Sequence, residues 1–148
     1  MKKHTKQKGK NVAKTPSKTT KYIYFISTII ISAVLLMGGQ AALLGAEQIA
    51  DSLTQTSMPL YLLPLLGVAK IAAVVAFWLP KKFSHNKTVA TLIEWAYAGV
   101  AINMFGAGFA HWQSGHTAQQ VVVPFVLLAV LIVARVYRGK YCSHYGKY

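Results

Sequence analysis

The sequence predicts an all-α integral membrane protein, a bundle of four transmembrane helices with both termini in the cytoplasm. Of the 148 residues, 54% are hydrophobic and only 13% are charged, which leaves little polar material to cover a soluble surface. The apolar residues gather in four long runs, and nearly all basic residues lie outside these runs. A net charge of +13 placed in this way indicates a membrane orientation signal, and we expect no nucleic-acid partner.

A lysine-rich tail precedes the first apolar run. Eight lysines lie among polar residues in positions 1–21, and because such a composition cannot bury apolar surface, we expect this tail to be disordered. Residues 22–44 follow without a charge, and at 1.5 Å per residue they reach roughly 34 Å, enough for a slightly tilted transmembrane helix. A cleavable signal peptide is the alternative interpretation, although signal peptides begin with a shorter basic region.

Three further apolar runs predict three further transmembrane helices. We place these spans at about 60–79, 91–112 and 121–136, of which the last is the shortest. A short interfacial helix is expected over 45–58, on the outer side of the membrane. The four spans make one domain over 22–137, and a basic cytoplasmic tail follows over 138–148.

Local signals set the ends of the middle spans. Pro59 suits the first position of the second span, and Pro80 discourages a helix at the residue before it. Thr91 and Glu94 match the capping box that starts a helix, which predicts that the third span begins there. Small residues at several positions permit close contact between helices. They are Gly38, Gly39, Ala42, Gly45, Gly99, Gly106 and Gly108.

The distribution of Lys and Arg predicts the orientation of the spans. Eight lie in the N-terminal tail, three in the loop between the second and third spans, and four at the C-terminal end, whereas the other two loops carry none. By the positive-inside rule, both termini and the middle loop lie in the cytoplasm. Of the 16 Lys and Arg, only Lys70 belongs to none of these three groups.

Lys70 is the first candidate for a functional residue. It lies roughly 13 to 15 Å from either end of its predicted helix, beyond an easy reach to water. An uncompensated charge at that depth costs about 2.5 to 3.5 kcal/mol. An ion pair with Glu94 on the third span is one hypothesis, and a lysine with a depressed pKa is another. A ligand-binding or proton-handling role for Lys70 is the third.

Asn103 and Tyr97 complete the candidate ligand-binding set with Lys70 and Glu94. Asn103 lies near the level of Lys70, on nearly the opposite helix face from Glu94. A hydrogen bond to another helix is the favoured interpretation of Asn103, and a contact with substrate is the alternative. The sequence carries no recognisable catalytic motif, so no catalytic residue is assigned.

We predict no intrinsic cofactor and no metal site. Cys142 is the single cysteine, which excludes an intrachain disulfide. Haem would need paired axial histidines, but His111 is the only histidine near a span. A metal site of His111, His116, Glu47 and Asp51 is an alternative whose spacing matches no known ligand pattern.

Three segments of the chain carry a family resemblance: residues 59–70, which end in Leu-Gly-Val-Ala-Lys, residues 79–80, and the Glu-Trp-Ala-Tyr-Ala-Gly of 94–99, together with His111. Through them the chain over about 22–137 resembles the DoxX-like family of small four-helix bacterial membrane proteins. The name comes from the small subunit of an archaeal thiosulfate:quinone oxidoreductase, and some relatives look like partners of membrane-associated redox enzymes. The resemblance implies a multi-pass protein of the bacterial plasma (inner) membrane and supplies no catalytic residue.

Three functions follow as hypotheses. The first is a non-catalytic membrane subunit or small-molecule-binding bundle whose polar interior holds the four candidate residues. The second is a quinone-binding subunit of an oxidoreductase, in which Lys70 bonds a quinone oxygen and Tyr97 or Trp95 packs on the ring. The third is a small transporter or proton-coupled carrier. Candidate partners are the lipid bilayer, a redox enzyme subunit and further copies of the chain.

Overall fold

A computed structural model describes residues 17–55, 57–80 and 86–143. All regular secondary structure in these residues is helical, which confirms the predicted all-α class. The helices are α1 (Lys18–Leu43), α2 (Glu47–Gln55), α3 (Leu62–Phe77), α4 (Lys87–Gln113) and α5 (Ala118–Ser143).

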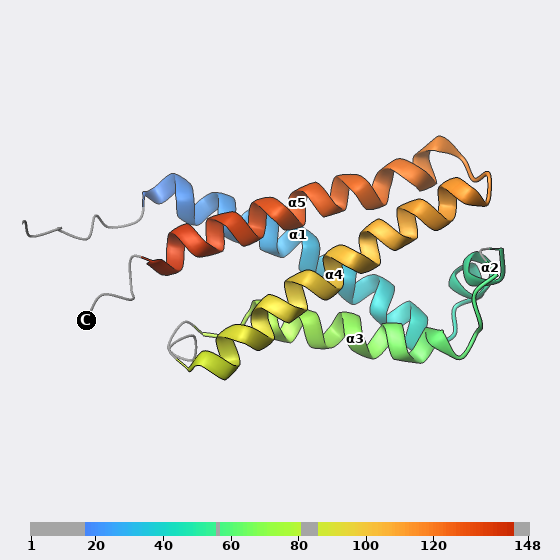
Figure 1. Ribbon diagram of the computed structural model, residues 1–148, viewed down its shortest axis with the longest axis horizontal. Coiled ribbons are helices and arrows are strands. Elements are labelled where there is room, and N and C mark those ends of the chain that lie inside the picture. Colours follow the sequence, from blue (N-terminus) through green and yellow to red (C-terminus); the bar gives the residue numbers. More distant parts are fainter. Residues whose placement is uncertain (1–16, 56, 81–85, 144–148) are drawn as a thin grey trace, which may run out of the picture.

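The helix ends gather at two opposite ends of the molecule (Figure 1). The start of α1, the end of α3, the start of α4 and the end of α5 lie at one end, which we call the inner end. Helix α2 and the connection from α4 to α5 lie at the other, which we call the outer end. This arrangement agrees with the sequence, which places the start of the first span, the end of the second, the start of the third and the end of the last on one side.

Three helices are long and apolar enough to cross a membrane, namely α1, α4 and α5. Helix α3 has 16 residues and reaches about 24 Å at 1.5 Å per residue. The expectation that the last span is the shortest is therefore wrong. Helix α5 continues to Ser143. Helix α3 begins at Leu62, so the prediction that Pro59 is the first helical residue is wrong. At the other end of α3, Pro80 lacks the N–H needed to continue the helix.

Two other helix starts differ from the prediction. Helix α1 begins at Lys18, within the expected tail, while residues 1–16 lie outside the described residues. Helix α4 begins at Lys87 with Asn86 as its N-cap, whose side-chain oxygen accepts from the Thr88 N–H at 2.9 Å. The predicted capping box is wrong, because Thr91 lies inside the helix and its hydroxyl donates to the Lys87 carbonyl oxygen. Asparagine is as strong an N-cap as threonine or stronger.

The surface of the molecule is apolar and part of its interior is polar. Met37 and Ile102 are each 73% exposed, whereas the side chain of Thr28 is only 1% exposed. Ser27 and Ser32 are buried beside it on α1. Contiguous apolar surface on this scale would be unfavourable in water, and small polar residues between helices are typical of membrane interiors. The distribution supports a membrane-type helical protein.

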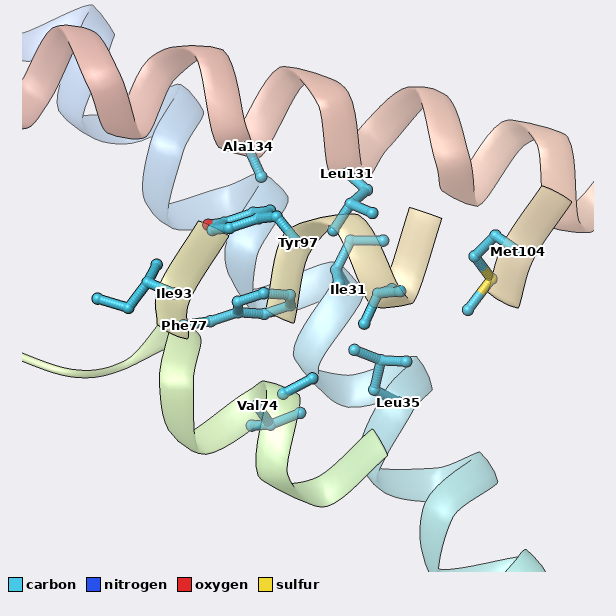
Figure 2. Close-up of a cluster of buried hydrophobic side chains, with 11 residues drawn as sticks. Ile31, Leu35, Val74, Phe77, Ile93, Tyr97, Met104, Leu131 and Ala134 are labelled. Atoms are coloured by element: carbon cyan, nitrogen blue, oxygen red, sulfur yellow. The ribbon is translucent and has the colours of Figure 1, made fainter. Parts of the chain in front are cut away.

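One core unites the four longer helices (Figure 2). Phe77 of α3 stacks on Tyr97 of α4, with ring centroids 4.3 Å apart. Ile31 and Leu35 of α1 and Leu131 of α5 are each at most 2% exposed and belong to the same cluster.

Close contacts at glycine hold two pairs of helices together. Gly39 of α1 meets Gly67 of α3, where a Cβ on Gly67 would lie 2.9 Å from the Gly39 carbonyl oxygen. A Cβ on Gly108 of α4 would lie 2.7 Å from the Phe125 ring of α5. The prediction of close contact is thus confirmed at Gly39 and Gly108, but Gly99 and Gly106 face open space.

Candidate functional site

A groove of about 730 Å³ lies beside the core, between α3 and α4. Its lining is almost entirely apolar and includes Leu35 of α1. Two polar side chains contribute to it, Lys70 from α3 and Asn103 from α4. The sequence placed these two residues near the same level, and the structure brings them to the same groove.

The groove exists because its walls carry small side chains. Ala69, Ala73 and Ala76 line it from α3, and Ala96 and Gly99 line it from α4. A Cβ added at Gly99 would meet no atom within 4 Å. Helix α3 instead packs closely on α1 through glycine, which leaves its other side apart from α4.

The Lys70 ammonium has no counter-charge within the part of the chain that the structure describes. Its Nζ lies 3.6 Å from the position that a Cβ would take on Gly38. The hypothesis of a Lys70–Glu94 ion pair is wrong, because Glu94 pairs elsewhere. Its carboxylate is 2.6 Å from both Nε and Nη2 of Arg135 on α5, and both side chains are well exposed.

Tyr97 and Asn103 lie on different sides of α4. Tyr97 is buried between α3 and α5, and its hydroxyl lies near the Arg138 guanidinium without completing a hydrogen bond of standard geometry. Asn103 faces the groove, and no interhelical hydrogen bond from its amide is found among the described residues. The four predicted site residues therefore separate into a groove pair, Lys70 and Asn103, and two residues that face α5.

A buried polar cluster at the inner end was missed by the sequence analysis. Arg138 of α5 is only 6% exposed. Its Nη1 donates to the Phe77 carbonyl oxygen at 2.7 Å and to the Tyr24 hydroxyl at 3.2 Å. Phe77 ends α3, where the last carbonyls lack intrahelical partners, and Pro80 has no N–H to offer. Arg138 thus caps α3 and joins it to α1 and α5.

The outer end holds a second polar cluster, in which two histidines meet. The Nδ1 atoms of His111 and His116 are 3.3 Å apart. Nε2 of His116 lies 2.6 Å from the side-chain oxygen of Gln55, the last residue of α2. Glu47 and Asp51 do not join them, since no group of three or more His, Cys, Asp or Glu placed to hold a metal occurs among the described residues.

Comparison with protein families matches residues 26–134 to the DoxX-like family. Comparisons with curated proteins and with solved structures find no match. The matched stretch runs from within α1 to within α5 and contains both walls of the groove. This confirms the resemblance that the sequence carries, and it agrees with three helices able to span a membrane. The chain therefore belongs to the DoxX-like family.

Proposed function

We propose that this chain is a multi-pass protein of the bacterial plasma (inner) membrane that binds an amphiphilic small molecule between α3 and α4. The observation that carries the proposal is Lys70, a cation whose side chain lines an apolar groove and has no partner in the described chain. In this proposal the protein acts as a membrane subunit or small-molecule-binding bundle.

The membrane orientation has support from charge. Lys18, Lys21 and Lys87 lie in the first turns of α1 and α4, at the inner end, whereas Glu47 and Asp51 lie in α2 at the outer end. By the positive-inside rule, the inner end faces the cytoplasm. We propose that α3 also crosses the membrane, since the apolar residues at both of its ends lengthen the stretch and a bilayer can thin around a short span.

The chemistry of the groove defines the class of ligand. An ammonium offers three donors and no acceptor, and an amide offers both. A ligand with an acidic or carbonyl head would satisfy Lys70 and Asn103, and an apolar tail would fit the alanine-rich walls. The polar head would supply the hydrogen bonds that the Lys70 ammonium cannot obtain from water in an apolar setting.

A quinone, with a redox enzyme subunit as partner, is the second candidate. It has two carbonyl oxygens for Lys70 and Asn103, and Trp95 lines the same groove. Tyr97, the other ring proposed to pack on a quinone, stacks on Phe77 and does not line the groove. Reduction of the quinone would require an external electron donor.

The test fills the groove without removing its charge. In Gly99→Leu the new side chain enters open space in the groove, and in the control Gly106→Leu the same side chain enters open space on α4 outside the groove lining. Native mass spectrometry of each protein, extracted in mild detergent, should show a bound small molecule in the parent and in Gly106→Leu but not in Gly99→Leu. A parent without any bound molecule, or equal occupancy in all three, would contradict the proposal.

A further inference from the structure

We propose that His111 and His116 form a binding site for a zinc ion at the outer end of the molecule, separate from the groove. The two imidazoles approach through their Nδ1 atoms, 3.3 Å apart, with ring planes at 80°. Both side chains are half-buried. Nothing in the proposed small-molecule binding uses them.

The backbone fixes this pair in place. Helix α4 ends in a Schellman motif, in which the Gly115 N–H bonds the Trp112 carbonyl and the His116 N–H bonds the His111 carbonyl at 3.1 Å. Gly115 supplies the left-handed residue, with φ of 67°. This motif brings the residue after the glycine against the last turn of the helix, usually in an apolar contact. Here both positions carry an imidazole, so the pair is preorganised.

The separation of the nitrogens suits a tetrahedral ion. Two nitrogens bound at 2.0 to 2.1 Å to tetrahedral zinc lie about 3.3 to 3.4 Å apart. Neighbouring nitrogens on a square-planar copper ion lie closer, at about 2.8 to 3.0 Å. The observed 3.3 Å, at which the two nitrogens share a hydrogen bond in the absence of a metal, matches the tetrahedral spacing and exceeds the square-planar one.

Gln55 positions the second ligand. Its side-chain oxygen lies 2.6 Å from Nε2 of His116, and an amide oxygen can only accept, so Nε2 carries the proton. In neutral His116 the lone pair is then on Nδ1, which faces His111. His111 would bind with Nδ1 deprotonated and its proton on Nε2. Such outer partners of metal-bound histidines commonly fix the tautomer and the ring orientation.

Water would complete the coordination, because no third His, Cys, Asp or Glu joins the pair among residues 17–55, 57–80 and 86–143. The Gln55 contact also links α2 to the turn after α4, together with the hydrogen bond of the Ser114 hydroxyl to the Gln55 carbonyl oxygen. Bound zinc would thus hold α2 against the outer end of α4.

The experiment removes other zinc ligands first. The parent for all measurements carries His4→Gln, His85→Gln, His144→Gln and Cys142→Ser, with an affinity tag free of histidine. Isothermal titration calorimetry with zinc chloride should give one zinc ion per chain. His111→Gln and His116→Gln should each weaken binding at least tenfold. Gln55→Leu should weaken it about tenfold to a hundredfold, and Gln55→Glu, which still accepts from Nε2, should restore it.

Circular dichroism checks that each variant keeps its helices. Because a histidine variant that fails to fold would also lose zinc, the two Gln55 variants give a second measurement that leaves both imidazoles in place. No binding by the parent, or equal affinity in the parent and in the double variant His111→Gln/His116→Gln, would overturn the proposal. Equal affinity in Gln55→Leu and Gln55→Glu would overturn the positioning role.

Discussion

Two cations lie among the apolar helices of this protein, Arg138 on α5 and Lys70 on α3, and their surroundings differ. Arg138 is buried against a helix end, where a free backbone carbonyl and a tyrosine hydroxyl accept its hydrogen bonds. Lys70 lies at the middle of α3 beside a groove and has no acceptor among the described residues.

The difference separates a structural cation from one available to a ligand. A charge removed from water is tolerated when the chain supplies its partners, and it then fixes the register of the helices. Arg138 meets that condition through Nη1, which satisfies a carbonyl that α3 leaves unpaired, whereas its buried Nη2 has no hydrogen-bond partner among the described residues. Lys70 does not, and a charge without partners in an apolar setting is costly. This contrast is why we place ligand binding at Lys70.

The largest effect is expected from Arg138→Met. It leaves the Phe77 carbonyl and the Tyr24 hydroxyl buried without a charged donor, and we expect a loss of about 3 kcal/mol in the free energy of unfolding. Thermal and denaturant unfolding in detergent measure this loss. Arg138→Lys keeps the charge and should recover part of it. A loss below about 1 kcal/mol would mean that the inner cluster is not what joins α1, α3 and α5.

We expect Lys70→Met to raise the free energy of unfolding, in contrast to Arg138→Met. Removal of an uncompensated charge from an apolar site should raise the free energy of unfolding of the ligand-free protein by about 1 to 3 kcal/mol. The same unfolding assay applies, with Ala72→Met as the control, because it adds the same side chain to the groove and leaves the charge in place. A destabilised Lys70→Met protein would show that Lys70 has a structural partner after all.

The smallest effect is expected for Glu94→Gln. The Glu94–Arg135 ion pair is 2.6 Å long, but its side chains are 50% and 39% exposed. Exposed pairs contribute about 0 to 1 kcal/mol, and salt screens them. The free energy of unfolding should therefore be slightly lower in Glu94→Gln than in the parent at low salt. This difference should shrink at high salt. A loss comparable to that of Arg138→Met would remove the distinction between exposed and buried cations at the inner end.

Much of the fold could be predicted from the sequence. Charge-free runs indicated the helices. The placement of Lys and Arg indicated which helix ends lie on the same side. Both signals can be read from the sequence without knowledge of the packing. Helix ends were less predictable. Asn86 and Thr91 are both plausible caps, and the structure uses Asn86. Likewise α5 extends past Val136 because Arg138 packs inward, which its position after an apolar run does not reveal.

The site was predicted in part for a similar reason. Depth along a helix follows from the rise per residue, so Lys70 and Asn103 could be matched from sequence. Which helices face each other does not follow from the rise per residue. Glu94 therefore could not be assigned from sequence to its partner on α5 rather than on α3. Pro80 is a weak sequence signal for the Arg138 cap on Phe77. A proline has no N–H, so it leaves a carbonyl unpaired but does not indicate which side chain donates to it. The histidine pair has a clearer one, since glycine between His111 and His116 favours a Schellman end.

The most direct test of the central claim is the amount of bound small molecule in Lys70→Met relative to the parent, measured in organic extracts of equal quantities of purified protein. We predict that the parent carries the molecule, that Lys70→Met loses most of it, and that Glu94→Gln keeps it. Full occupancy in Lys70→Met would contradict the claim that Lys70 is the cation that the ligand requires.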